Sequence, residues 1–232
     1  MRQLHLFHLF HLFHLCLAIT TALAAGLAGM AQAQEFPSKP VRLIVTFTQG
    51  GAADLTARVF GDKLAEIWKQ SVVIENRIGG GGSIGAEAVF RAPADGYTLL
   101  LATNTHIINH VVYPSLGFDF TKDFPGLGLV TSARSPSLPE VPTVAESGIA
   151  QLKNFALDNY YGFMAPPGTP PAILAKIEAD IGRVAAMPDV RKKRDGAGLD
   201  MLVMSSGDMM RLIRADAEKY GKAAKLAGIK AE

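Results

Sequence analysis

Apolar residues change their spacing along the first part of the chain, and each change marks the passage from a strand to a helix. Residues 41–47 (VRLIVTF) form a short, β-branched apolar run that predicts a strand, and small residues follow over 48–53. Residues 54–70 then carry apolar side chains at the spacing of one helix face, which predicts a helix that packs on a sheet. Asp54 is the expected N-cap of this helix.

The same order of strand and helix repeats further along. Two more strands are expected at 71–76 (SVVIEN) and 97–102 (YTLLLA), and the second is so uniformly apolar that it indicates burial on both faces. Between them lie a glycine-rich turn (79–82) and a helix over 83–91 with Ser83 at its N-cap. This alternation predicts an α/β fold with a mostly parallel sheet flanked by helices.

The rest of the chain has weaker patterns. Thr169 as N-cap and Pro170 at the first helical position predict the start of a helix with a clear apolar stripe through residue 184. Prolines among small polar residues predict an extended connector over 131–142. The other expected elements are helices at 105–113 and 206–227 and strands at 124–130, 155–164 and 201–204.

The first 33 residues have the pattern of an export signal. Arg2 precedes an apolar run over 15–29, and Ala31-Gln32-Ala33 matches an A-x-A cleavage site. The sequence therefore predicts a cleaved signal peptide over 1–33 and a mature chain that begins at Gln34. The alternative is an uncleaved membrane anchor formed by the same apolar stretch.

Composition and charge exclude several classes of function. The chain is 49% hydrophobic, which is enough for the core of an ordinary globular domain. With Arg2 set aside, 22 of the 23 basic residues remain against 21 acidic residues, so no nucleic-acid partner is expected. Cys16 lies in the predicted leader and is the only cysteine, so the mature chain has no thiol nucleophile and no disulfide.

The glycine cluster matches two enzyme patterns without their supporting features. Gly80-x-Gly82-x-x-Gly85 has the dinucleotide-binding form, but the next strand ends without an acidic residue to hold a ribose. Ser83 stands in a nucleophile-elbow pattern, but about half a dozen residues separate it from the preceding strand, where a sharp elbow needs almost none. No catalytic residue and no cofactor are therefore expected, and a small hydrolase that uses Ser83 is the unfavoured alternative.

Two histidines invite a metal interpretation. His106 and His110 are four residues apart and share a helix face, but a zinc site needs a third protein ligand, and no nearby acidic residue has a telling spacing. Ordinary packing of the two histidines is the favoured interpretation, and no metal is expected.

The first strand, turn and helix form the best candidate binding site. Gly50 and Gly51 let the backbone approach a ligand closely, and the first N–H groups of the following helix favour an anion such as a carboxylate. Thr103 and Asn104 end the third strand, at the sheet edge where ligands of open α/β sheets bind.

Several ordered motifs point to a family. FxxGGxxDxxAR at 47–58, VVIENRxGxGGxIGAEAV at 72–89, DGYTLLLAT at 95–103, RSPxLPxVPTVAESG at 134–148 and YYGFMAPPGTP at 160–170 resemble the Bug-type periplasmic substrate-binding receptors of tripartite tricarboxylate transporters. The resemblance implies a periplasmic receptor that closes two α/β lobes over a small organic carboxylate and delivers it to membrane permease subunits. The ligand-contacting residues that it implies are Phe47, Thr48, Gly50, Gly51, Ala52, Asp54, Thr103 and Asn104.

The chain departs from the family at one point. In the family a second lobe of about a hundred residues, a typical size for one α/β lobe, follows the fourth strand. Here Val130 runs directly into Thr131, so the sequence predicts that residues 34–130 and 143–232 form one lobe and that the second is missing. Apolar surface at 127–130 would then be exposed, which predicts self-association. A non-functional remnant or an interaction module is the alternative.

Overall fold

The computed structural model describes residues 36–113, 115–131, 160–195 and 202–229. The described residues from 39 onward form one structural unit, to which all the elements below belong. The predicted signal peptide and most of the predicted connector lie outside the described residues. None of the described helices is both long enough and apolar enough to cross a membrane.

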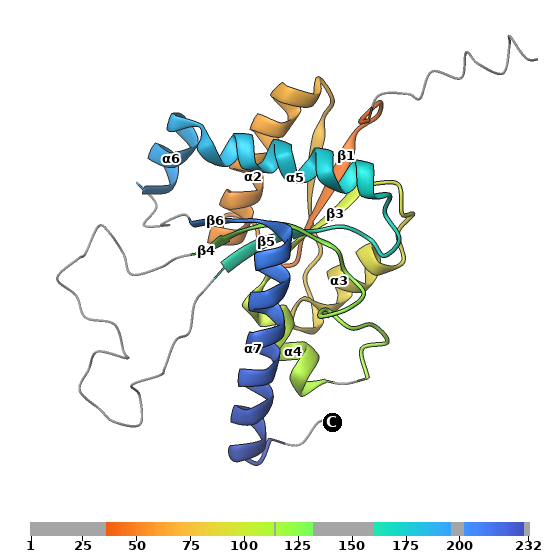
Figure 1. Ribbon diagram of the computed structural model, residues 1–232, viewed down its shortest axis with the longest axis vertical. Coiled ribbons are helices and arrows are strands. Elements are labelled where there is room, and N and C mark those ends of the chain that lie inside the picture. Colours follow the sequence, from red (N-terminus) through yellow and green to blue (C-terminus); the bar gives the residue numbers. More distant parts are fainter. Residues whose placement is uncertain (1–35, 114, 132–159, 196–201, 230–232) are drawn as a thin grey trace, which may run out of the picture. The chain divides into compact units, whose positions relative to one another are not determined.

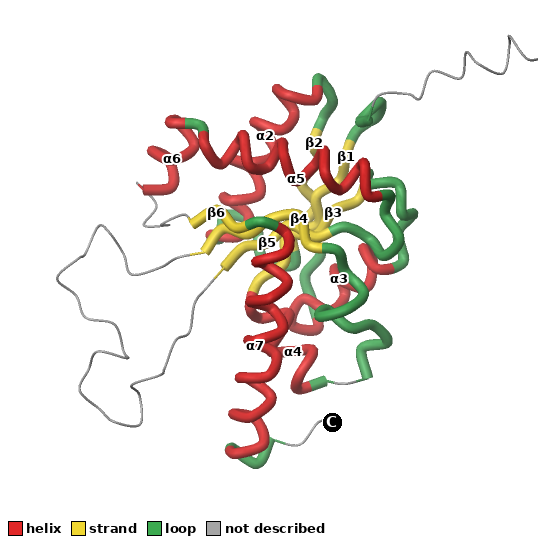
Figure 2. The backbone as a smooth tube through the Cα atoms, viewed as in Figure 1, coloured by secondary structure: helices red, strands yellow, loops and turns green. Residues whose placement is uncertain are grey.

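Six strands form one mixed sheet in the order β2-β1-β3-β5-β4-β6 (Figure 2). Strand β1 lies between β2 and β3 and pairs with both in parallel, whereas β5 is antiparallel to both β3 and β4, and β6 is antiparallel to β4. The strands are β1 (Val41–Val45), β2 (Val72–Asn76), β3 (Thr98–Thr103), β4 (Gly126–Thr131), β5 (Tyr160–Met164) and β6 (Leu202–Met204).

The predicted α/β class is confirmed, but the prediction of a mostly parallel sheet is wrong, because only two of the five strand pairs are parallel. Strand β4 has the same direction as β3, as the order of strands and helices predicted. Strand β5, however, comes between them in the opposite direction. Local patterns specify that a segment is a strand but not which neighbour it pairs with.

Helices cover both faces of the sheet (Figure 1). Helices α2 and α5 contact each other on one face, and the Trp68 indole N–H donates to Asp180 Oδ2 at 2.7 Å between them. Helices α3, α4 and α7 lie on the other face. The helices are α2 (Ala52–Trp68), the 3-10 turn η1 (Gly80–Gly82), α3 (Ser83–Phe90), α4 (Asn104–Val112), α5 (Pro171–Ala186), α6 (Pro188–Asp195) and α7 (Ser206–Leu226).

Three predicted helix starts are wrong by one to three residues. Gly51, not Asp54, is the N-cap of α2, Gly82 rather than Ser83 precedes α3, and Pro170 rather than Thr169 precedes α5. In each case a polar residue with good capping chemistry stands one to three positions from the real cap. A sequence pattern cannot choose among such close alternatives, because the backbone dihedral angles decide the cap.

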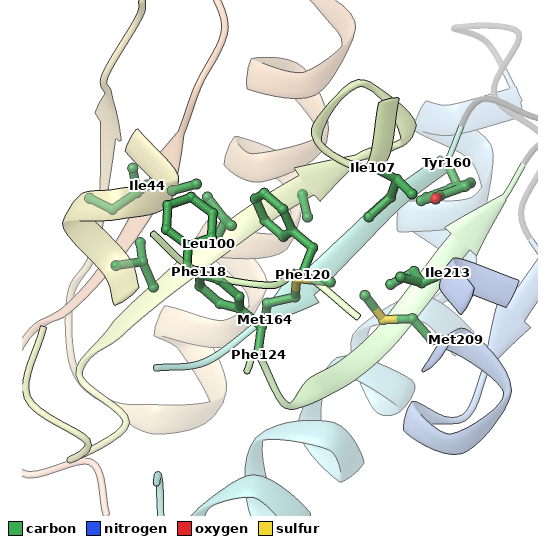
Figure 3. Close-up of a cluster of buried hydrophobic side chains, with 13 residues drawn as sticks. Ile44, Leu100, Ile107, Phe118, Phe120, Phe124, Tyr160, Met164, Met209 and Ile213 are labelled. Carbon is green, nitrogen blue, oxygen red and sulfur yellow. The ribbon is translucent and has the colours of Figure 1, made fainter. Parts of the chain in front are cut away.

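The core on the α7 side of the sheet is rich in aromatic side chains (Figure 3). Phe118 and Phe120 come from a segment between α4 and β4 for which no element was predicted, and Phe124 precedes β4, whose strand was predicted to begin at this residue. All three are buried. Their rings lie 5.0–5.6 Å apart, and they pack against Leu100 of β3 and Met164 of β5. All six residues of β3 are buried, which confirms that this strand is covered on both faces.

Candidate functional site

The carboxyl ends of β1, β2 and β3 meet at one edge of the sheet because these strands are parallel. Each strand is followed at this edge by a turn or a helix N-terminus: residues 46–51 after β1, the glycine turn after β2, and α4 directly after β3. In open α/β sheets ligands bind at such an edge.

A pocket of about 270 Å³ opens at this edge. Its walls come from the turn after β1, the first residues of α2, the junction between β3 and α4, and one residue of β5. The hydroxyl groups of Thr48, Thr105 and Tyr161 offer hydrogen bonds, and none of the lining residues is charged. The lining residues are Phe47, Thr48, Gly51, Ala52, Ala53, Thr103, Thr105 and Tyr161.

The N-terminus of α2 forms one wall of this pocket. Its N-cap Gly51 is in an extended conformation and supplies no side-chain hydrogen bond to the helix. The N–H groups of Ala52, Ala53 and Asp54 therefore have no carbonyl acceptor within the helix, and the positive end of the helix dipole lies with them. Since Ala52 and Ala53 line the pocket, this wall favours an anionic group.

Asp54 is buried beneath the turn and holds it in place. Its carboxylate accepts the Gly50 N–H at 2.9 Å and a two-pronged ion pair from Arg58 at 2.8 and 3.0 Å. The Asn76 side-chain amide donates to Asp54 Oδ1 at 3.0 Å and also to the Phe47 carbonyl at 2.9 Å. The Arg58 guanidinium, assisted by the other donors, lowers the pKa of Asp54 to about 2.

These contacts give Asp54 a structural task. Its side chain is 1% exposed, and both carboxylate oxygens accept hydrogen bonds from within the protein. Asp54 is also absent from the pocket lining. The carboxylate thus fixes the shape of the turn that carries Phe47 and Thr48.

His106 lies below the opposite side of the pocket and is fully buried. Its Nδ1 accepts the Thr103 backbone N–H at 3.0 Å, which completes a capping box at the start of α4. Because Nδ1 is an acceptor, the neutral ring carries its proton on Nε2 and donates it to Thr46 Oγ1 at 3.0 Å. Burial lowers the pKa of His106 to about 4.

We expect the buried histidine to make the protein sensitive to mild acid. Between pH 6.5 and 4 the unfolded chain protonates this histidine while the folded protein keeps it neutral, so stability falls as pH falls through this window. The loss approaches about 1.4 kcal/mol per pH unit and totals about 3 kcal/mol. Denaturation followed at pH 7, 6, 5 and 4 measures it.

The control for this prediction is His106→Gln, because glutamine keeps an acceptor and a donor at this capping-box position but does not titrate. The variant is expected to show a flatter stability profile between pH 6.5 and 5, where most carboxylates remain ionised. An unchanged slope in the variant would contradict the assignment.

The structure brings five of the eight predicted site residues together and leaves three outside the pocket lining. Gly50 donates its N–H to Asp54, Asp54 lies beneath the turn, and Asn104 is not among the lining residues. Ala53 and Thr105 were missed although they adjoin predicted residues. Tyr161 was missed because it arrives from β5, and no local signal connects that strand to this edge. The five lining residues are Phe47, Thr48, Gly51, Ala52 and Thr103.

The enzyme and metal alternatives find little support in the geometry. Both ring nitrogens of His106 are hydrogen-bonded to Thr46 and Thr103, so this ring has no nitrogen left to activate Ser83. His110 lies 3.4 Å from Asp119. Among the described residues there is no group of three or more histidine, cysteine, aspartate or glutamate side chains that would hold a metal ion.

Comparison with known proteins places this arrangement in context. The profile of the family described as "Tripartite tricarboxylate transporter family receptor" matches residues 56–132 and 121–229. A relative, the "UPF0065 protein in tcbD-tcbE intergenic region" of Pseudomonas sp. (strain P51), is 23% identical over an alignment 290 residues long. The alignment covers 81% of this chain and 86% of the relative. "Protein BugT" of Bordetella pertussis is 36% identical over 108 residues, and the match covers 46% of this chain and 33% of BugT.

Solved structures share the fold. "Structure of periplasmic binding protein BugD" superimposes with a TM-score of 0.76 at 20% identity and covers 85% of this chain and 100% of that one. "MatC (Rpa3494) from Rhodopseudomonas palustris with bound malate" gives a TM-score of 0.70 at 21% identity, with 81% and 99% covered. "R. palustris Rpa4515 with adipate" gives 0.70 at 23% identity, with 84% and 99% covered.

The matches have two further features, of which the first lies at β4. The two segments that match the family profile overlap at residues 121–132, so this stretch resembles the family in two places. In the alignment with the Pseudomonas relative, 81% of 232 residues is about 188, so about 100 of the 290 aligned positions have no residue of this chain.

Proposed function

The chain belongs to the tripartite tricarboxylate transporter family of receptors, and we propose on that basis that its pocket binds a small organic carboxylate in the periplasm. The observation that carries the proposal is the α2 N-terminus, where N–H groups without helix acceptors form a pocket wall beside the hydroxyl groups of Thr48 and Thr105. Structural neighbours described with bound malate and adipate support this class of ligand.

We also propose that this receptor has one lobe in place of two. The two profile matches overlap at residues 121–132, which include β4. A join inside β4 would produce this overlap. In a two-lobed receptor one strand leads out of the first lobe and a later strand leads back into it, and here a single strand would resemble both. The roughly 100 unmatched positions agree with the size of an α/β lobe. We keep the join proposed from the sequence, between Val130 and Thr131, which falls within this overlap.

A one-lobed receptor is expected to bind its ligand weakly. The second wall of the cleft would be missing, and each lost neutral hydrogen bond costs about 1 kcal/mol, or about fivefold in affinity. We therefore expect millimolar or weaker dissociation constants for malate, adipate and a tricarboxylate by isothermal titration calorimetry of the mature chain. Micromolar binding would contradict the one-lobe proposal, and no binding at tens of millimolar would contradict the carboxylate site.

The contribution of the helix N-terminus can be isolated with Ala52→Pro. Proline is well tolerated at the first helical position, and the extended Gly51 is a compatible preceding residue, so the change removes one N–H donor and leaves the helix intact. We expect roughly fivefold weaker binding, whereas the control Ala52→Ser keeps the N–H and binds as the parent does.

Delivery of the ligand to membrane permease subunits is the finer part of the proposal. Co-purification of the mature chain with a permease would support it, and failure to associate would favour the alternative of a remnant or an interaction module. Receptors of this family and the structural neighbours are solute-binding proteins rather than enzymes. Ester turnover that is lost in Ser83→Ala would favour the hydrolase alternative instead.

Self-association is the remaining expectation, but Leu127, one residue of the predicted apolar surface at 127–130, does not contribute to it. Leu127, at the join, is fully buried. Large apolar side chains are exposed elsewhere, among them Leu55 in the first turn of α2 (48% exposed) and Ile78 and Ile84 on either side of the glycine turn (57% and 56%). We expect the mature chain to associate with rising concentration in light scattering and Ile78→Ser/Ile84→Ser to associate less. A parent protein that stays monomeric at high concentration would contradict this expectation.

A further inference from the structure

Three segments that follow parallel strands converge on His106. Thr46 follows β1 and meets Nε2, and Thr103 ends β3 and meets Nδ1. Gly82, in the turn after β2, packs so closely that a Cβ atom built there would lie 2.9 Å from Nε2 and 3.1 Å from Thr46 Oγ1. His106 therefore stands where the three strand ends meet, directly behind the pocket.

The hydrogen bonds of His106 connect two walls of the pocket. Thr46 is followed directly by Phe47 and Thr48, and Thr103 itself lines the pocket together with Thr105. Thr46, Thr103 and His106 are each at most 3% exposed, so water does not compete for these bonds. The distance between the two walls is thus set through one imidazole ring.

The ring also packs against two aromatic side chains. It stands edge-on to the Phe47 ring, with the centroids 6.1 Å apart and the planes at 81°. Phe120 contacts it from the core, at 5.3 Å and 66°. The imidazole therefore packs between Phe120 of the aromatic core and the pocket residue Phe47, so that the core helps to fix the position of Phe47.

We propose that His106 is a positioning residue of the binding pocket: as a neutral imidazole with its proton on Nε2, it holds the Thr46–Thr48 turn and the Thr103–Thr105 segment at the spacing that a carboxylate ligand requires. The proposal rests on the carboxylate-binding function above, but the geometry itself is present without ligand. His106 does not touch the ligand and acts through Phe47, Thr48 and Thr103.

The test compares four variants by calorimetry with the tightest carboxylate found for the parent. His106→Leu removes both hydrogen bonds and is expected to weaken binding at least tenfold, whereas His106→Gln keeps one donor and one acceptor and should stay within about threefold. Thr46→Val removes the Nε2 partner at constant shape. If His106 acts through Thr46, the double variant His106→Leu/Thr46→Val binds no more weakly than His106→Leu alone.

A control separates positioning from general stability. Ile213→Ala, in the buried core of α7, destabilises the fold without a contact to the pocket and should leave the affinity unchanged. Equal loss of affinity in His106→Leu and Ile213→Ala, or additive losses in the double variant, would overturn the proposal.

An NMR measurement on the unliganded protein tests the role of His106 separately from carboxylate binding. The ¹⁵N shifts of the His106 ring in the unliganded protein should show a protonated Nε2 and an unprotonated Nδ1. Thr46→Val should shift the amide signals of Thr103 and Thr105 across the pocket. The opposite tautomer, or a response confined to the neighbours of Thr46 in sequence, would overturn the proposal even if carboxylates bind. If calorimetry detects no carboxylate binding but the NMR result is as expected, only the binding function is overturned.

Discussion

Replacement of Phe120 by alanine is expected to lower the free energy of unfolding by about 3–5 kcal/mol, which is among the largest effects that one substitution in this chain can have. The ring is 1% exposed and stacks on Phe124 with centroids 5.0 Å apart. It also contacts Phe118 and His106 edge-on. Alanine would leave a cavity in the centre of this cluster, which connects the core to the pocket.

Urea denaturation at pH 7 measures this effect. Phe120→Leu keeps more of the volume and should lose less stability than the alanine variant, so it remains measurable if Phe120→Ala does not fold. Tyr113→Ala is the surface control, since Tyr113 is 43% exposed and its loss should change stability by about 0.5 kcal/mol or less. A Phe120→Ala protein as stable as this control would show that the aromatic cluster is not part of the folded core.

Asp54→Ala is expected to destabilise the protein by about 2–4 kcal/mol and to loosen the turn before α2. The substitution removes the acceptor of the Gly50 N–H and both prongs of the Arg58 ion pair. The Asn76 amide keeps its bond to the Phe47 carbonyl but loses its bond to Asp54. Since Phe47 and Thr48 line the pocket, ligand affinity should fall together with stability.

The acid dependence of stability identifies the Asp54 contribution. The folded-state pKa of about 2 is below the unfolded value near 3.8, so the ionised carboxylate stabilises the fold at neutral pH and this stabilisation is lost as pH falls from about 4 to 2. Asp54→Ala should lack that component, whereas Asp62→Asn, an exposed neighbour on the same helix, should retain it. Identical acid profiles for the parent and Asp54→Ala would refute this role.

The folded structure gives Asp54 a different place from the one its sequence position indicated. Asp54 follows a glycine pair and precedes a helical stripe, a pattern that fits an N-cap and also fits a ligand contact. The helix begins two residues earlier, at Ala52, so the side chain of Asp54 points back under the turn. The hydrogen bonds to Arg58 and Asn76 fix this orientation of the side chain, and Asn76 belongs to β2, which is distant in sequence.

The sequence by itself determined the elements whose signals are local. Apolar spacing located β1, α2, β2 and β3 to within a few residues. The small residues after β1 indicated an anion site at a helix start, which stays a prediction. The motif series indicated the receptor family, which the family profile confirms. These properties depend on residues close together along the chain, so one sequence is enough to show them.

Only the tertiary structure decided what depends on distant partners. The antiparallel insertion of β5 between β3 and β4 brought Tyr161 to the pocket, and the fold made a core of three phenylalanines from a segment without regular pattern. It also assigned His106 to the junction of three strand ends. Strand pairing and burial depend on free energies summed over residues far apart in sequence, and local spacing does not encode them.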